Sequence, residues 1–116
     1  MKIYCYERCS TCKKALAWLD CNDINYELVD IKENNPGLEE LKAAYQASGL
    51  PLKKFFNTSG NLYKEMKLKD KLPQMSEEEQ LALLSTDGML VKRPLVIGTD
   101  FVLTGFKEAE WKEKVL

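Results

Sequence analysis

Two cysteines three positions apart, Cys9 and Cys12, lie where a short apolar strand pattern over Lys2–Tyr6 changes to a helical pattern over Thr11–Asp20. The first turn of a helix leaves backbone N–H groups unpaired, and the aligned peptide dipoles place partial positive charge there. A thiol at that point is stabilised as its anion, which raises its reactivity at neutral pH. The second thiol, one turn along, can attack a mixed disulfide formed on the first. The motif therefore predicts a two-step redox centre at a strand-to-helix junction.

The bulk composition limits the class of protein. With 116 residues, 45% of them apolar and 30% charged, the chain is expected to be one globular domain over residues 1–116. A formal net charge of −1 argues against direct nucleic-acid binding. No apolar run approaches the about 20 residues that a membrane span needs. The first residues also lack the apolar stretch of a signal peptide, so we expect a cytoplasmic protein.

The cysteines and the absence of histidine restrict the chemistry. The chain has four cysteines and no histidine, so a cysteine–histidine nucleophile pair is excluded. Clustered cysteines in a reducing compartment are catalytic or metal-binding more often than structural. Cys5 and Cys21 fit small apolar core residues, whereas Cys9 and Cys12 lie in a polar turn. Four thiolates are also a complete ligand set for zinc. Structural zinc sites usually contain two C-x-x-C pairs, however, and Cys5 and Cys21 do not form a second such pair, so we expect no bound metal.

The remaining pattern predicts an α/β protein. A second strand is expected at Asn25–Ile31, parallel to the first because of the short helical crossover between them. A helix follows Pro36-Gly37 and ends at Gly49. Two short β-rich runs, Leu95–Ile97 and Phe101–Leu103, form a predicted hairpin, and a last helix is expected over Phe106–Leu116.

Short helices are expected between Lys53 and Leu90. Ser76 and Glu79 have the spacing of a capping box and mark the start of one of them. Gly88 is expected to close that helix.

Basic residues form two further candidate sites. Lys92-Arg93-Pro94 is either a plain strand start with two solvated cations or a site where Arg93 lies beside the Cys9 thiol. In the second case the guanidinium stabilises the thiolate and can bind a tetrahedral oxyanion through two hydrogen bonds. Lys53 and Lys54 are either a solvated helix edge or a source of positive potential for the same pocket.

Several motifs, taken together, resemble the glutaredoxin-like arsenate reductase family (ArsC and Spx type), which includes Spx-type regulators of bacterial RNA polymerase. They run in order along nearly the whole chain: Cys9–Ala15, Trp18-Leu19, Phe55–Gly60, Lys92–Leu95, Gly105-Phe106 and Trp111. The resemblance implies a thioredoxin-like fold, in which a βαβ half and a ββα half form a mixed four-stranded sheet. A helical insertion separates the two halves.

The resemblance also implies roles for individual residues. Cys9 matches the nucleophilic cysteine, Cys12 the resolving thiol that closes a reversible disulfide, and Arg93 the arginine that faces them. The expected oxyanion or substrate site is completed by Ser10, Thr11, Lys53, Lys54 and Pro94. No cofactor is expected to be bound, and the reductant is an external thiol system, either glutathione with glutaredoxin or thioredoxin.

Two departures from the family pattern bear on the substrate. The family's reductases use three arginines for arsenate, and this chain has two arginines in all, Arg8 and Arg93. Lys53, Lys54 and Lys107 stand where the others are expected, and lysine supplies charge without the planar fork. Disulfide chemistry or redox sensing is therefore favoured over efficient arsenate binding.

Three functions are compatible with the sequence. The first is a monomeric thiol oxidoreductase of this family that reduces arsenate or another oxyanion or disulfide substrate. The second is an Spx-like redox-sensing regulator that binds the RNA polymerase alpha subunit, although Spx proteins continue with a basic tail where this chain ends at Leu116. The third is a family member that has kept the fold and the thiols with little activity.

Overall fold

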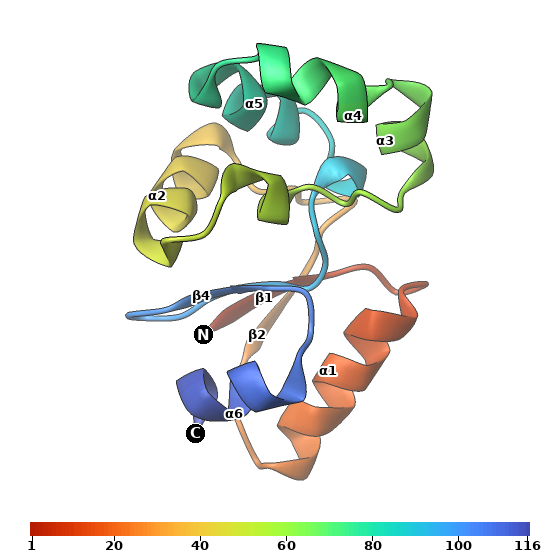
Figure 1. The fold of residues 1–116 in the computed structure, drawn as a ribbon. Coiled ribbons are helices and arrows are strands. Elements are labelled where there is room, and N and C mark those ends of the chain that lie inside the picture. The colour runs from red at the N-terminus through yellow and green to blue at the C-terminus, as the bar shows by residue number, and fades with distance from the viewer.

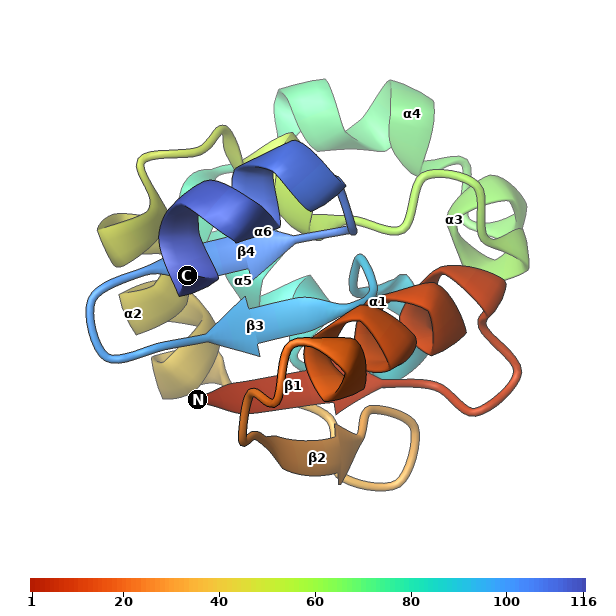
Figure 2. The ribbon, with the colours of Figure 1, turned by 90° about the horizontal axis from the view of Figure 1, so that it is seen from below.

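The structure is a computed structural model that describes residues 1–116. Its centre is a four-stranded sheet in the order β2-β1-β3-β4 (Figure 2). β1 is parallel to β2 and antiparallel to β3, and β3 is antiparallel to β4, so the predicted mixed sheet is confirmed. The strands are β1 (Lys2–Cys5), β2 (Glu27–Asp30), β3 (Leu95–Ile97) and β4 (Val102–Thr104).

Helices cover both faces of this sheet (Figure 1). α1 (Ser10–Cys21) and α6 (Glu108–Val115) lie on one face. The segments between β2 and β3 lie on the other, which confirms the predicted insertion between a βαβ half and a ββα half. They are α2 (Leu38–Ser48), η1 (Leu52–Phe55), α3 (Asn61–Glu65), α4 (Leu68–Lys71), η2 (Leu72–Gln74), α5 (Glu77–Leu84) and η3 (Gly88–Leu90).

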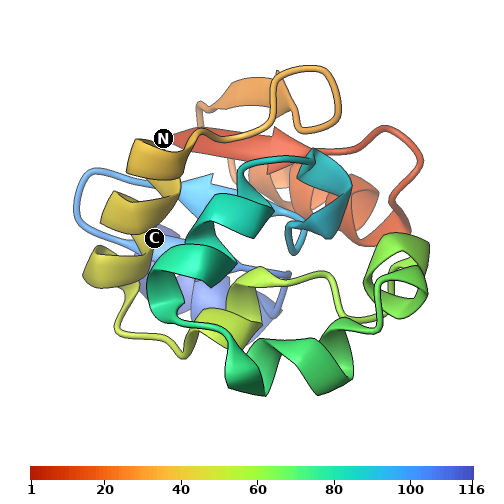
Figure 3. The ribbon, with the colours of Figure 1, turned by 90° about the horizontal axis from the view of Figure 1, so that it is seen from above.

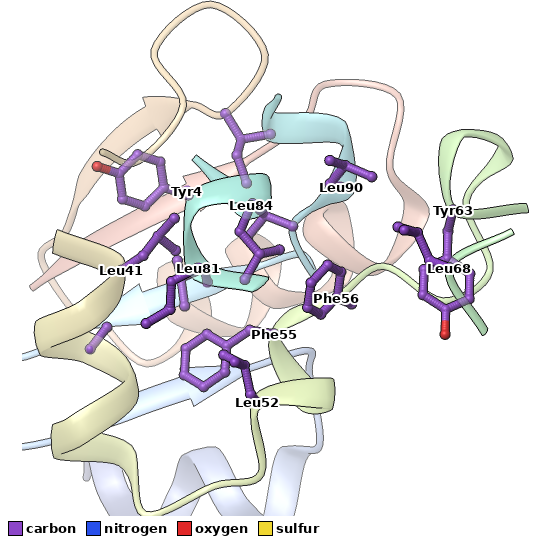
Figure 4. Packing of buried hydrophobic residues seen from close by; sticks show 14 of the residues in the cluster. Tyr4, Leu41, Leu52, Phe55, Phe56, Tyr63, Leu68, Leu81, Leu84 and Leu90 are labelled. Carbon is purple, nitrogen blue, oxygen red and sulfur yellow. The ribbon is translucent and has the colours of Figure 1, made fainter. Parts of the chain in front are cut away.

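The alternation of side chains along β1 divides the core in two. Ile3 and Cys5 point to the face covered by α1 and α6, where they pack with Trp111 and other buried residues. Tyr4 points to the opposite face and joins the larger cluster under the insertion (Figure 4). This period of two is what the pleat of a strand requires, and it places Cys5 on the same side of the sheet as α1.

The insertion has its own apolar interior. α2 packs against α5 and reaches β4 (Figure 3). Phe55 and Phe56, at the end of η1, lie buried between these helices and the sheet. Leu81, Leu84 and Leu90 close the cluster from α5 and η3 (Figure 4).

The predicted capping box at the start of α5 is confirmed, but the predicted end of that helix is wrong. The Glu79 N–H donates to Ser76 Oγ at 3.1 Å, and the Ser76 N–H donates to Glu79 Oε1 at 3.0 Å. α5 ends at Leu84, and Gly88 begins η3 instead of closing the helix. The reason for a glycine there is tertiary, because a Cβ on Gly88 would lie 1.9 Å from the Ile31 carbonyl oxygen.

The other elements differ from prediction only at their ends. The final helix begins at Glu108 because Phe106 instead packs edge-on against Trp111, with ring centroids 4.9 Å apart. The hairpin before it is closed by Gly98 N–H donating to the Phe101 carbonyl at 2.8 Å, which moves β4 one residue along. No helix is long and apolar enough to cross a membrane.

Candidate functional site

Cys9 is the N-cap residue of α1. Its backbone is extended (φ −91°, ψ 115°), its carbonyl accepts from the Lys13 N–H at 3.1 Å, and its own N–H donates to the Tyr6 carbonyl at 3.0 Å. Serine, threonine, asparagine and aspartate are preferred here because their oxygens accept from free N–H groups of the first turn. No side-chain cap is formed in this helix, and the half-buried thiol stands in its place. The Cys9 thiol therefore lies beside the free N–H groups of the first turn of α1.

Cys12 lies in the first turn of α1 and is only 1% exposed. The expectation that both motif cysteines occupy a polar turn is therefore wrong for Cys12, since its side chain turns inward onto β1 and packs in the cluster that holds Cys5. Cys21, expected in the core, is exposed at the other end of the helix. The two motif thiols thus differ sharply in access to solvent.

The surroundings of Cys12 favour its thiolate. Hydrogen bonding with the Cys5 thiol has the largest effect and lowers the pKa of Cys12, while burial opposes it. The Tyr6 backbone, the Cys9 thiol and the positive charge of Arg93 lower the pKa further. The same hydrogen bond, together with burial, raises the pKa of Cys5. Of these two buried thiols, Cys12 therefore ionises first and Cys5 stays protonated.

Arg93 stands in the segment before β3, on a cis peptide bond to the buried Pro94. Its guanidinium carbon lies 5.3 Å from the centre of the Tyr6 ring, and Nη1 lies 3.9 Å from the Met89 sulfur. Arg93 makes no ion pair with a carboxylate. The one salt bridge of the molecule joins Lys2 and Glu40. The guanidinium charge is therefore not neutralised by a carboxylate, and it lowers the pKa of Cys12.

A cavity of about 710 Å³ opens beside the first turn of α1. Thr11 lines it from α1, and Lys53 and Lys54 line it from η1. Lys92 and Lys107 line it from the segments before β3 and before α6. We call these five residues and the space between them the lysine cleft. Four lysines against one carboxylate, Glu110, give the cavity a positive potential.

The predicted site residues fall into two neighbouring groups. Cys9, Cys12 and Arg93 form the thiol centre, and Pro94 supports it, its carbonyl accepting from the Gly105 N–H at 2.9 Å. Thr11, Lys53 and Lys54 belong to the lysine cleft, whereas Ser10 is exposed at the start of α1 and lines neither.

Sequence reasoning did not assign Cys5, Lys92 and Lys107 to the site. The alternation along β1 was a signal for Cys5, since it puts that thiol on the face that α1 covers. Lys92 adjoins the Arg93-Pro94 motif, and Lys107 follows the last strand where an arginine was expected.

The side chains that could bind a metal ion are dispersed over the molecule. No group of three or more cysteine, aspartate or glutamate side chains is arranged to hold a metal ion. The four-thiolate zinc set considered from the sequence is not assembled, because Cys21 lies a full helix away from Cys9 and Cys12. All four cysteines are free thiols.

Known proteins resemble this chain over nearly its whole length. The ArsC family profile matches residues 4–114. YusI of Bacillus subtilis, an uncharacterized protein, is 51% identical over 113 residues, which cover 97% of this chain and 96% of YusI. The global transcriptional regulator Spx 2 of Bacillus anthracis is 23% identical over 108 residues, 93% of this chain and 81% of that regulator.

Solved structures match over the same length. A Bacteroides fragilis protein described as related to the ArsC family has a TM-score of 0.95 at 58% identity, over 97% of this chain and 94% of that one. The arsenate reductase from Vibrio cholerae has a TM-score of 0.83 at 29% identity, over 100% of this chain and 98% of that one.

Proposed function

This chain belongs to the ArsC family, and we propose that it is a thiol oxidoreductase in which Cys9 is the nucleophile and Cys12 the resolving thiol. The observation that carries the proposal is the difference in solvent exposure between the two thiols at the N-terminal end of α1. Cys9 is half-buried at the N-cap, where an incoming substrate can reach it, and Cys12 is enclosed one turn behind it. A thiol that resolves an adduct has no need to meet the substrate itself.

The reaction proceeds by two thiol–disulfide exchanges. The Cys9 thiolate attacks one sulfur of a substrate disulfide, forms an S–S bond to it, and releases the other sulfur as a thiolate that takes up a proton. The Cys12 thiolate then attacks Cys9 Sγ, closes the Cys9–Cys12 disulfide and releases the second substrate thiol. The substrate gains two electrons and the protein loses two, which an external thiol reductant returns.

The basic groups favour an anionic substrate. Arg93 lowers the pKa of Cys12 and is positioned to stabilise negative charge at the thiols. The lysine cleft begins at Thr11, beside the same helix turn, and can bind the charged part of a substrate whose sulfur reaches Cys9. Its volume of about 710 Å³ exceeds the needs of one tetrahedral oxyanion, so we favour an organic disulfide carrying carboxylates over arsenate.

Substitution of single cysteines tests the roles. The test uses reduced Cys21→Ser protein, in which the exposed thiol cannot react with the substrate. In that protein, Cys9→Ser abolishes exchange with a disulfide substrate, because no accessible thiol remains. Cys12→Ser leaves the first exchange intact but arrests the protein as a mixed disulfide on Cys9, which mass spectrometry of the intact chain detects as an added substrate half. Cys21→Ser is the matched control and keeps turnover at the parent rate, since that exposed thiol lies outside the site. An active Cys9→Ser protein contradicts the proposal.

A second function is favoured by the likeness to the Bacillus anthracis regulator Spx 2. In this second function, closing the Cys9–Cys12 disulfide changes a surface of the protein that binds the RNA polymerase alpha subunit. The protein itself does not contact nucleic acid. Pull-down with that subunit, using the reduced and the oxidised protein, tests this function. Binding in one redox state supports it, and no binding in either state removes it.

A further inference from the structure

The helical insertion contains a second cavity, of about 420 Å³, that the proposed thiol exchange does not use. Its lining residues all lie between Tyr45 and Gln80, and they come from α2, η1, α3, α4, η2, α5 and the loop before η1. We call this cavity the insertion pocket. Only Pro51 and Lys53 line both this pocket and the cavity of the lysine cleft. Its volume is within the range of sites that bind small organic molecules.

The walls of the insertion pocket are apolar and partly aromatic. Leu52 and Leu72 line it and are each 7% exposed, and Tyr63 lines it and is 6% exposed (Figure 4). Tyr45 lines it from α2, and its ring lies edge-on to Phe55 with the ring centroids 6.1 Å apart. Aromatic rings pack on one another edge-on or offset, so two tyrosines beside two leucines favour a ligand with a flat apolar body.

One polar group of the pocket has no partner within the protein. The Tyr63 hydroxyl makes no hydrogen bond, whereas every side-chain nitrogen or oxygen that is fully enclosed has a partner. The other polar groups of the lining are engaged: the Tyr45 hydroxyl donates to Glu77 Oε1 at 2.9 Å, and Gln80 Nε2 donates to two backbone carbonyls at 3.1 and 3.2 Å. Buried hydroxyls are normally hydrogen-bonded, so the Tyr63 hydroxyl is available to a ligand in the pocket.

The charges of the lining favour an anionic group on that ligand. Lys53 lines the pocket from η1 and Lys69 from α4, and neither belongs to the one salt bridge of the molecule. Glu77 is the one carboxylate of the lining, and it already accepts from a tyrosine hydroxyl. Two cations against one carboxylate give the pocket a positive potential.

We propose that the insertion pocket is a second binding site, for a small aromatic carboxylate distinct from the disulfide substrate. The ring of this ligand packs among Tyr45, Leu52 and Leu72, and its carboxylate accepts from the Tyr63 hydroxyl and is attracted by Lys69. Binding of this kind needs no thiol, so it goes beyond the proposed oxidoreductase function.

Titration of the reduced, ¹⁵N-labelled protein with naphthoate, followed by NMR, locates the site. We expect saturable shifts of the backbone amides of Leu72 and Gln80, and little change at Thr58 and Thr104, which line only the cavity of the lysine cleft. Naphthylmethanol, a neutral molecule with the same ring, is expected to bind at least about 5-fold more weakly, since it lacks the charge. Shifts confined to the lysine cleft, no saturable shift, or equal affinity for the two molecules would overturn the proposal.

Three single substitutions then test the assigned contacts. Tyr63→Phe removes only the hydroxyl, and Lys69→Gln removes only the charge. Each is expected to raise the Kd for naphthoate about 3- to 10-fold. Lys71→Gln, on the same helix but outside both cavities, is the matched control and is expected to leave that Kd unchanged. An unchanged Kd in both Tyr63→Phe and Lys69→Gln, or an equal rise in Lys71→Gln, refutes this site. Because none of these variants touches a thiol, naphthoate binding supports the site even if the protein reduces no disulfide.

Discussion

At the scale of single residues, the centre works through the unequal environments of neighbouring thiols. Cys9 replaces an oxygen-bearing N-cap residue, and Cys12 is buried with Cys5 behind it. Local sequence predicted the first of these, because the strand-to-helix change and the cysteine spacing are visible within a few residues. It did not predict the second, because whether a first-turn side chain points outward or inward depends on what the sheet presents to it.

The lowered pKa of Cys12 predicts a pH dependence of stability. A group whose pKa is lower in the folded than in the unfolded state contributes stability above its unfolded value, and loses it as the pH falls through the folded value. Cys12→Ser removes that contribution. We therefore expect the stability difference between the parent and Cys12→Ser to shrink by about 1 kcal/mol or more between about pH 8.5 and about pH 6.

Urea unfolding of both reduced proteins at the two pH values measures this change. Cys5 does not disturb the comparison, because burial keeps it protonated in the folded state over this range and its ionisation in the unfolded chain is the same in both proteins. The same difference at both pH values would show that Cys12 is not ionised in the folded protein.

At the scale of elements, what the sequence predicted well is what is encoded locally. The capping box of α5 forms as predicted, because Ser76 and Glu79 bond to each other's backbone. The prediction that Gly88 ends a helix is wrong, because the lack of a side chain at Gly88 serves a contact with Ile31, which lies 57 positions earlier in the chain. η3 is thereby held against the chain leaving β2.

We expect Gly88→Ala to destabilise the protein by about 3 kcal/mol, because the new Cβ overlaps a backbone carbonyl that cannot turn aside as a side chain would. The matched control is Gly37→Ala at the N-cap of α2, where a Cβ meets nothing within 4 Å. It is expected to cost less than about 1 kcal/mol. Thermal and denaturant unfolding compare the two, and similar losses in both would refute the steric account.

At the scale of the whole molecule, the order of motifs predicted the layered arrangement correctly, including the helical insertion. Which residues line the lysine cleft could not be predicted from the order of the motifs. Its cations come from η1 and from the segments before β3 and before α6, and only the folded chain brings Lys53, Lys92 and Lys107 to one cavity.

The cleft predicts that turnover of an anionic disulfide depends on salt. Lys53→Gln combined with Lys54→Gln is expected to lower kcat/KM about 5- to 10-fold at low ionic strength and to flatten its decline with salt, because screened charges no longer attract the substrate. Lys69→Gln with Lys71→Gln, exposed on α4 and outside the cleft, is the control. Equal effects of the two pairs would show that general surface charge, and not the cleft, attracts the substrate.

The length of α1 has a practical consequence for handling the protein. Its 12 residues separate the N-cap thiol from Cys21 by about 18 Å, far beyond the reach of a disulfide. A covalent dimer on a non-reducing gel therefore reports air oxidation at Cys21. Closure of the redox centre leaves the chain monomeric on that gel and is visible only by mass or by thiol counting.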